Sequence, residues 1–219
     1  TLKFLKDLKK NNNKPWFDAN RKVYDTAKAD FISFIDAVIE KHGKKDPSIA
    51  HLAAKDCIFR INRDVRFSKD KSPYKTNMGA YINKDGKKGI SAGYYFHCEP
   101  GAAFGGGGLY MAPPDQLKNI RQEIDYNWKE FQKIINSKKF KAVFGDLSTE
   151  GDMKLSRPPK GYEADNPAIE YLKLKSWVGM QQFSDADLTS KDLVKKVCTN
   201  FETLQPLLLF LNEGLHAGE

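Results

Sequence analysis

The fold is decided by residues 78–110, MGAYINKDGKKGISAGYYFHCEPGAAFGGGGLY. Residues 78–83 and 90–97 flank a segment that contains an Asp-Gly pair, a turn signal, so we expect two antiparallel strands here. Residues 103–110 are expected to add the next strand. The four consecutive glycines within it weaken a strand, and they indicate a bulge or the close approach of another backbone segment.

Helices are expected before this sheet. Residues 2–9 have an amphipathic pattern, and Pro15 fits the first turn of a second helix that should run to His42. Apolar residues recur in the second helix at spacings of three and four, which is typical of a helix face that packs against a core. A short strand is expected at Cys57–Ile61, between these helices and the sheet.

Helices are expected again after the sheet, together with one more strand. The pair Pro113-Pro114 should start a helix, and a helical pattern continues from Asn127 to Phe144. A short helix near 167–173 is then expected to precede a strand at 177–183.

The last helix is expected to begin near Thr189 or Ser190, because either hydroxyl can cap it, and Pro206 should kink or restart it. Strands that cluster between helical ends indicate an α+β protein and not alternating βαβ units. We therefore predict a single α+β domain over residues 1–219, with a largely antiparallel central sheet flanked by N-terminal and C-terminal helices.

The composition is that of a basic globular protein. Of the 219 residues, 40% are apolar and 29% are charged, and the net charge is +8. The longest apolar run, Leu207–Leu211, is far shorter than the roughly 20 residues that a membrane span needs, so no membrane association is expected. Cys57, Cys98 and Cys198 are far apart, which indicates free thiols in a reducing compartment and predicts a cytoplasmic protein.

The most distinctive segment is residues 57–75, which is rich in cations. Six basic residues stand against Asp64 and Asp70, so these 19 residues carry a net charge of +4, half of the total. The six are Arg60, Arg63, Arg66, Lys69, Lys71 and Lys75. The arginines matter most, because a guanidinium binds phosphate or carboxylate through two parallel hydrogen bonds. Like charges packed this densely repel unless solvent or an anion separates them.

Apolar residues alternate with these cations and should anchor the backbone, so that the charged tips keep a fixed direction. They are Phe59, Ile61, Val65 and Phe67. We therefore hypothesise a pocket that binds a phosphorylated or carboxylated small molecule. If the pocket also catalyses a reaction, Asp64 or Asp70 is the candidate general base and Tyr74 the candidate proton donor. The sequence identifies no cofactor.

The run FRINRDVRFSKDKSPYKTN, residues 59–77, resembles the signature of a bacterial and fungal family catalogued as domain of unknown function 2461. The resemblance extends over nearly the whole chain. It includes FLKDLKKNNNKPWF at 4–17, GGGLYMAPPDQLKNIRQEI at 106–124, RPPKGYEADNP at 157–167 and LKLKSW at 172–177. It implies no established activity, substrate or cofactor.

The resemblance also implies which positions belong to the family motif. These are Arg60, Arg63, Asp64, Arg66, Lys69, Asp70, Lys71, Tyr74 and Lys75, with Arg121, Arg157, Pro158, Lys160, Gly161 and Tyr162 as satellites. The anion-binding set is therefore extended to Arg121, Arg157 and Lys160. One departure is Asn166, where the family pattern has His, which argues against a proton-transfer role at that position.

The second basic loop, residues 157–162, is stiffened by two prolines. If it faces the first loop, Arg157 and Lys160 complete a charged cleft; the alternative is a rigid surface connector. No metal site is predicted, because no HExxH motif or Cys and His ligand spacing occurs. His97 and Cys98 are neighbours on an expected strand, so their side chains should point to opposite faces and share no site.

Two other functions stay open. The cationic motif could be the internal ion-pair network of a structural or interaction protein, because such networks also gather charge without binding a ligand. A nucleic-acid-binding module is the further alternative, in which the basic loops would track phosphates. The mixture of cations with carboxylates counts against this second alternative.

Overall fold

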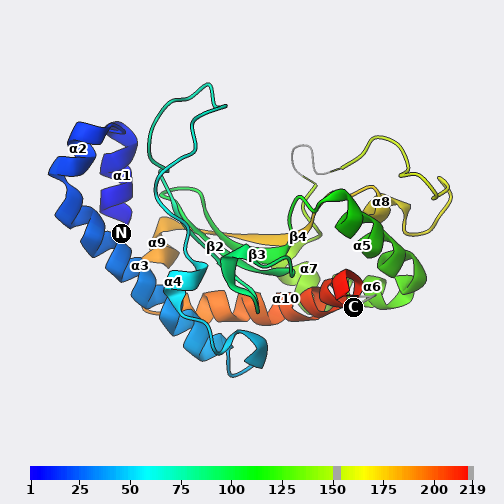
Figure 1. Cartoon of the computed structure of the whole chain (residues 1–219). Coiled ribbons are helices and arrows are strands. Elements are labelled where there is room, and N and C mark those ends of the chain that lie inside the picture. Colours follow the sequence, from blue (N-terminus) through cyan, green and yellow to red (C-terminus); the bar gives the residue numbers. More distant parts are fainter. Residues whose placement is uncertain (150–153, 217–219) are drawn as a thin grey trace. The chain divides into compact units, whose positions relative to one another are not determined.

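The computed structural model describes residues 1–149 and 154–216. They form helices and a four-stranded antiparallel sheet (Figure 1), as the sequence predicted. The strands are β1 (Met78–Ile82), β2 (Gly93–Cys98), β3 (Ala103–Leu109) and β4 (Trp177–Phe183), and they lie in the order β1-β2-β3-β4. The predicted strand at 177–183 is confirmed to the residue.

Helices precede and follow the strands. Before β1 lie α1 (Leu2–Lys10), α2 (Lys14–Ala19), α3 (Arg21–His42), a 3-10 turn η1 (Pro47–Ile49) and α4 (Ala54–Cys57); η2 (Gly86–Lys88) links β1 to β2. Between β3 and β4 lie α5 (Pro114–Tyr126), α6 (Trp128–Ile135), α7 (Lys138–Phe144) and α8 (Ile169–Leu172). After β4 come α9 (Asp185–Leu188) and α10 (Leu193–His216).

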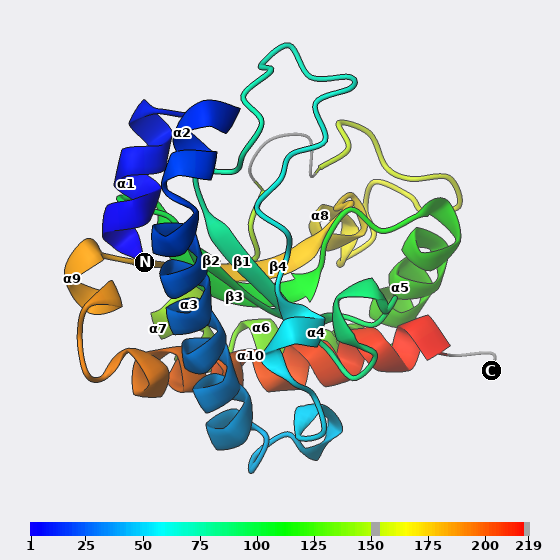
Figure 2. The same ribbon diagram turned by 60° about the vertical axis from the view of Figure 1, so that its left-hand side comes forward.

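The single helix expected from Pro15 to His42 is in fact two helices, which is a correction. Asn20 ends α2, because its side-chain amide donates to the carbonyl of Trp16 at 2.9 Å. Asn13 caps the start of α2 by accepting a hydrogen bond from the Trp16 N–H at 3.0 Å. The apolar spacing continues across this break, so periodicity alone does not reveal it. Figure 2 shows α1 and α2 lying beside the first turns of α3, which they contact.

Two further predictions are wrong. Cys57–Ile61 is not a strand, because Cys57 ends α4 and only an isolated bridge joins Ile58 to Ala80 of β1. The Phe59 N–H adds one bond, to the carbonyl of Gly79 at 2.9 Å. Pro206 does not restart the last helix, since α10 runs from Leu193 through it to His216.

The glycine-rich strand β3 confirms the expected close backbone approach. A Cβ atom at Gly106 would stand 2.2 Å from the carbonyl oxygen of Gly179. At Gly108, where φ is +132°, a Cβ would stand 1.9 Å from the carbonyl oxygen of Trp177. The glycines of β3 therefore let the neighbouring strand lie against it.

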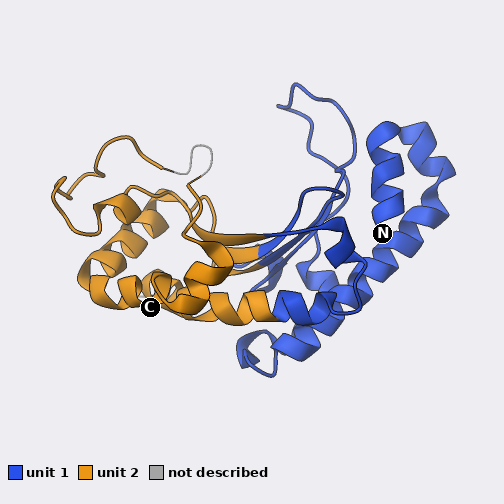
Figure 3. Cartoon of the chain, turned by 180° about the vertical axis from the view of Figure 1, so that it is seen from behind, with its two compact units in different colours: residues 1–89, 95–105, 182–198 blue, residues 90–94, 106–181, 199–219 orange. Residues whose placement is uncertain are grey.

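Two compact units divide the chain (Figure 3). Unit 1 comprises residues 1–89, 95–105 and 182–198, and unit 2 comprises residues 90–94, 106–181 and 199–219. Whether the chain behaves as the single domain expected from its sequence stays a prediction.

Each unit has aromatic side chains in its core. In unit 1, Phe17 stacks on Tyr74 with ring centroids 4.0 Å apart and also contacts Tyr24. In unit 2, Phe131 contacts Phe210 at 5.3 Å. Such pairs bury large apolar areas and add specific ring contacts.

The cysteines and the helices bear on two of the sequence predictions. Cys57, Cys98 and Cys198 are buried, and none of the three forms a disulfide in the described chain. Burial raises the pKa of Cys57 to about 11 and that of Cys98 to about 12, so these thiols stay protonated near neutral pH and are poor nucleophiles. Over residues 1–149 and 154–216, no helix combines the length and apolar character that crossing a membrane requires.

Candidate functional site

The cationic segment folds into a hairpin-like arm of unit 1. An antiparallel bridge joins Asn62 to Tyr74, and it is flanked by backbone bonds from the Arg63 N–H to the Pro73 carbonyl and from the Lys75 N–H to the Ile61 carbonyl. Residues 64–72 form the loop that closes this arm, visible in cyan in Figures 1 and 2. We call residues 61–75 the motif hairpin.

Arg63 ties the closing loop together from inside. Its guanidinium forms an ion pair with Asp70, donates to the Ser72 carbonyl at 3.1 Å and reaches the Ser68 hydroxyl at 3.4 Å. Hydrogen bonds from Ser72, and then the Arg63 guanidinium, lower the pKa of Asp70 to about 2. Asp70 is therefore ionised and fully engaged, which makes it a poor general base.

Two other cations of the motif hairpin also have partners within the loop. Arg66 forms a two-point contact with Asp64, at 3.0 Å through Nε and 2.7 Å through Nη2. Arg66 lowers the pKa of Asp64 by these hydrogen bonds. Lys71 donates to the Val65 carbonyl at 3.0 Å. Like Arg63, these cations therefore already have internal partners.

Lys75 differs from these residues. It is half-buried, and its ammonium lies 5.4 Å from the centre of the Phe59 ring. Burial, and then the charge of nearby Arg60, lowers the pKa of Lys75. Within the described ranges, no carboxylate lies within 4.0 Å of its ammonium. Lys75 is therefore a partly desolvated cation whose charge is not neutralised by a neighbouring side chain.

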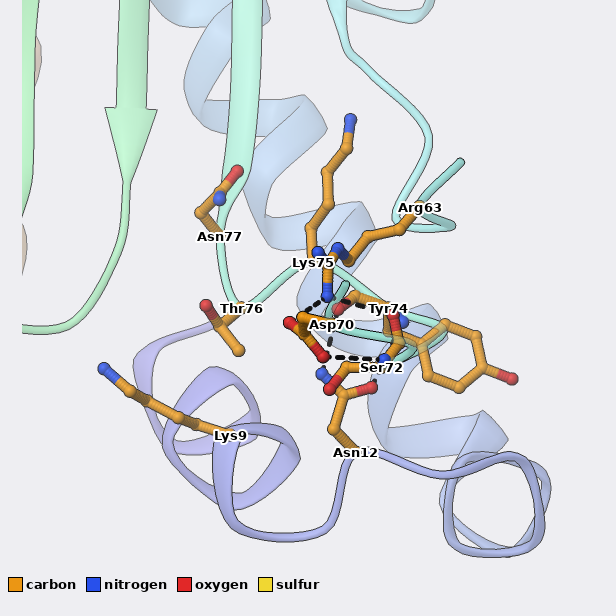
Figure 4. A pocket seen from close by; sticks show the side chains of 9 residues that line it. All are labelled: Lys9, Asn12, Arg63, Asp70, Ser72, Tyr74, Lys75, Thr76 and Asn77. Carbon is orange, nitrogen blue, oxygen red and sulfur yellow. Dashed lines mark hydrogen bonds and ion pairs between the residues drawn. The ribbon is translucent and has the colours of Figure 1, made fainter. Parts of the chain in front are cut away.

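A cleft of about 260 Å³ opens beside the motif hairpin (Figure 4). We call it the hairpin cleft. Its lining comprises Lys9, Asn12, Arg63, Asp70, Ser72, Tyr74, Lys75, Thr76 and Asn77. Three of these side chains are cationic and one is a carboxylate, so the lining is positively charged. Figure 4 shows the Lys75 side chain extending away from the dashed contacts of Arg63, Asp70 and Ser72.

Tyr74 is held in place as part of this lining. Asn12 donates to the Tyr74 carbonyl at 2.9 Å and accepts from the Tyr74 N–H at 3.1 Å. The Tyr74 ring is buried against Phe17. Figure 4 shows its hydroxyl and the Lys75 ammonium pointing in different directions, so this geometry does not place the Tyr74 hydroxyl beside Lys75.

The remaining predicted anion-binding residues do not all belong to the same unit. Arg60 and Lys69 are exposed residues of unit 1. Arg121, Arg157 and Lys160 belong to unit 2, so their combination with the motif hairpin into one cleft stays a prediction. Arg121 donates to the carbonyls of Leu172 and Leu174, at 2.7 and 3.2 Å, and supports the chain that leads into β4.

Asn166, the position at which the family pattern was expected to have His, has a structural role here. Its amide donates to Asp125 at 2.6 Å, and its carbonyl oxygen accepts from the Ala168 N–H at 2.8 Å. Both ends of the side chain are thus engaged in holding the turn before α8. No proton transfer is needed to explain the residue.

A polar chain that the sequence did not predict runs along β2 to Glu99, the residue that follows the strand. Tyr95, His97 and Glu99 alternate with buried residues, and we call them the β2 triad. The Tyr95 hydroxyl lies 3.0 Å from His97 Nδ1, and His97 Nε2 lies 3.2 Å from Glu99 Oε2. The signal was the period of two along the strand, because every second side chain shares a face. His97 is adjacent to Cys98 in sequence but shares its face of the strand with Tyr95 and Glu99.

The β2 triad reaches the hairpin cleft through Glu99. The Thr76 hydroxyl donates to Glu99 Oε1 at 2.9 Å, and the Lys9 ammonium lies 4.0 Å from the same oxygen. Thr76 and Lys9 both line the hairpin cleft. No cluster of three or more His, Cys, Asp or Glu side chains in the described chain is arranged to hold a metal ion.

Comparison with known families identifies the chain. A family model described as "Conserved hypothetical protein (DUF2461)" matches residues 1–210. The chain belongs to this family. The DUF2461 match covers the motif hairpin, the β2 triad and the whole sheet, and the description assigns no activity to any of them. Comparisons with curated proteins and with solved structures gave no match.

Proposed function

We propose that the hairpin cleft binds a small molecule that carries a carboxylate or phosphate group, with Lys75 as its main cationic contact. The observation that carries the proposal is the environment of Lys75, which is half-buried, positively charged and without a carboxylate partner in the described part of the chain. An anion placed there would replace the hydration that burial removes and would offset the repulsion from Arg60.

Neighbouring residues complete the binding set. The Asn77 side-chain amide lines the same cleft and has no hydrogen-bond partner in the described ranges, so it can donate to an anion. Lys9, whose ammonium lies 4.0 Å from Glu99, adds a second cation to the binding set. The Arg63–Asp70 pair acts as the scaffold that holds the hairpin wall, and not as part of the binding set.

The pairing of Arg63 and Arg66 with carboxylates favours a second candidate, in which the motif hairpin is only an internal ion-pair network. The two candidates differ at Lys75. A structural network has no need of a desolvated lysine without a counter-charge, because such a group costs folding free energy. In a binding site, a bound anion offsets that cost, and this contributes to the affinity for the ligand.

Binding is tested by calorimetric titration with two probes, inorganic phosphate and succinate, which distinguish the phosphate class from the carboxylate class. The wild-type protein is compared with Lys75→Gln and with Lys69→Gln, a matched loss of charge at an exposed lysine of the same hairpin outside the cleft lining. We expect Lys75→Gln to weaken binding roughly 10- to 100-fold, as for loss of a hydrogen bond to a charged group.

Lys69→Gln should leave the affinity for either probe nearly unchanged. Equal weakening by both substitutions would indicate nonspecific attraction to a basic surface and would reject the site. Absence of binding of both probes to the wild-type protein would favour the ion-pair network.

A further inference from the structure

The β2 triad has the connectivity of a proton relay. A carboxylate only accepts hydrogen bonds, so His97 must donate from Nε2 to Glu99. In the neutral imidazole Nδ1 is then the acceptor, and the Tyr95 hydroxyl donates to it at 3.0 Å. Glu99 thus fixes the tautomer in which His97 presents a basic nitrogen to a hydroxyl.

The surroundings hold this arrangement in place. The Phe104 ring stacks on the His97 ring with centroids 4.8 Å apart and planes 12° from parallel. The side chains of His97 and Glu99 are only 15% and 19% exposed, so the solvent competes weakly for their hydrogen bonds. Glu99 also accepts a hydrogen bond from the Thr76 hydroxyl through Oε1, which holds the carboxylate with Oε2 directed at His97.

We propose that the β2 triad is an acid–base centre that exchanges a proton with the molecule bound in the hairpin cleft, with Tyr95 as the contacting group, His97 as the proton acceptor and Glu99 as the positioning residue. This inference rests on the proposed function for its substrate class, a carboxylated or phosphorylated molecule that also bears a hydroxyl group. Thr76 and Lys9 connect Glu99, one end of the triad, to the cleft. At the other end, the Tyr95 ring lies 6.4 Å from the Phe59 ring, the same ring over which the Lys75 ammonium lies at 5.4 Å.

In the proposed step, one proton moves from the bound molecule to the β2 triad. The hydroxyl of the bound molecule gives its proton to Tyr95 Oη while the Tyr95 proton passes to His97 Nδ1. The products are an alkoxide on the bound molecule and an imidazolium that is paired with Glu99, and no electron is transferred. Burial raises the pKa of Tyr95 to about 12, so the hydroxyl loses its proton near neutral pH only with help from an adjacent base.

The test measures how reactive the Tyr95 hydroxyl is, and it requires no knowledge of the substrate. N-acetylimidazole acetylates tyrosine hydroxyls: the Oη–acetyl bond forms, the reagent's C–N bond breaks, and the departing imidazole takes a proton. The acetylation rate of each tyrosine is followed by mass spectrometry of peptides. The exposed Tyr110 and Tyr126, which are 66% and 75% exposed, are internal standards in the same protein.

We expect Tyr95 to react at least as fast as the two exposed tyrosines, although it is more buried. His97→Gln should slow acetylation of Tyr95 roughly 100-fold, the lower range for loss of a general base, and leave Tyr110 and Tyr126 unchanged. Unchanged rates at these standards and an unchanged circular dichroism spectrum verify that the variant is folded.

Glu99 is tested by the pH profile of the same reaction. In the wild-type protein the Tyr95 rate should fall in acid, because a general base acts only in its unprotonated form. Glu99→Gln should change the pH at which the acetylation rate falls, and it should lower the maximal rate at higher pH. Glu99→Asp should restore part of that maximal rate. A Tyr95 that reacts more slowly than Tyr110 and is indifferent to both His97→Gln and Glu99→Gln would overturn the relay. Anion binding with an inert Tyr95 would leave the proposed function intact.

Discussion

Gly79 of β1 lies against the hydroxyl of Tyr95, so closely that a Cβ at position 79 would stand 2.6 Å from Tyr95 Oη. The absence of a side chain on β1 therefore makes room for the hydroxyl that contacts His97 on β2. The atom that a larger residue would meet is the far end of a side chain, and not the backbone. The glycine consequently affects the position of one functional group more than it affects the sheet.

Gly79→Ala is expected to separate Tyr95 from His97 within the β2 triad without unfolding the protein. The added methyl should push the Tyr95 ring aside and break its 3.0 Å contact with His97, at a cost to unfolding free energy of about 1 kcal/mol. Acetylation of Tyr95 should then become independent of His97, as measured by comparing Gly79→Ala with the double variant that adds His97→Gln. A triad that still responds to His97→Gln would contradict this assignment.

Gly108→Ala should behave in the opposite way, with a large loss of stability. A Cβ there would stand 1.9 Å from the Trp177 carbonyl oxygen, and φ is +132°, a backbone conformation that side chains disfavour. Both strands would have to move apart, so we expect a loss of about 3 kcal/mol or more in denaturant unfolding. Gly101→Ala is the matched control, because φ is +76° but no atom lies within 4 Å of its Cβ. It should cost only about 1 kcal/mol.

The arginines of the motif hairpin should differ in their effect on the loop at residues 64–72. Arg63 is 25% exposed and joins Asp70, Ser72 and Ser68, whereas Arg66 is 76% exposed and contacts only its near neighbours. Arg63→Ala should speed hydrogen exchange and proteolytic cleavage within the loop, and Arg66→Ala should change either rate little. Equal effects of the two substitutions would mean that Arg63 is not the residue that closes the loop.

Asp70 should make the stability of the loop at residues 64–72 dependent on pH. Its pKa is lowered from 3.8 to about 2 in the folded chain, so its bonds stabilise the loop above pH 3.8 and are lost as pH falls through about 2. The Ser72 amide, which donates to Asp70 at 2.9 Å, reports this titration by its chemical shift in NMR spectra. Asp70→Asn should remove the transition. A midpoint near 3.8 in the wild-type protein would show that the carboxylate has no such partners in solution.

Local patterns predicted most elements of the fold, and two of the failures have separate causes, a single side-chain hydrogen bond at Asn20 and a long-range bridge at Ile58. The Pro113-Pro114 pair located the start of α5, because proline is favoured in a first turn. The break at Asn20 was missed because one side-chain hydrogen bond decides it, while the apolar spacing runs on. Cys57–Ile61 is apolar except for Arg60, as a short strand can be, but only Ile58 forms a bridge, with Ala80, which local sequence does not reveal.

In the candidate site, too, local sequence predicted some features, and others depend on the folded chain. The charge density of residues 57–75 located the motif hairpin, but sequence did not reveal which cations would be neutralised by carboxylates. Arg63 and Asp70 are seven residues apart and pair only because the loop closes between them. The distinct state of Lys75 depends on burial beside Phe59 and on Arg60, both of which require the folded chain.

Lys75 gives the sharpest pH test of the proposed function. Burial lowers its pKa from 10.5, so in the free protein its ammonium loses its proton at lower pH than an ordinary lysine does. A bound anion favours the charged form, so binding is linked to proton uptake and must weaken as pH rises. The affinity for succinate, whose carboxylates stay ionised, should fall as pH rises toward 10.5, the ordinary pKa of lysine. Lys75→Arg keeps its charge over that range, so its affinity should stay level. An identical decline in both proteins would place the titrating group elsewhere and reject Lys75 as the anion contact.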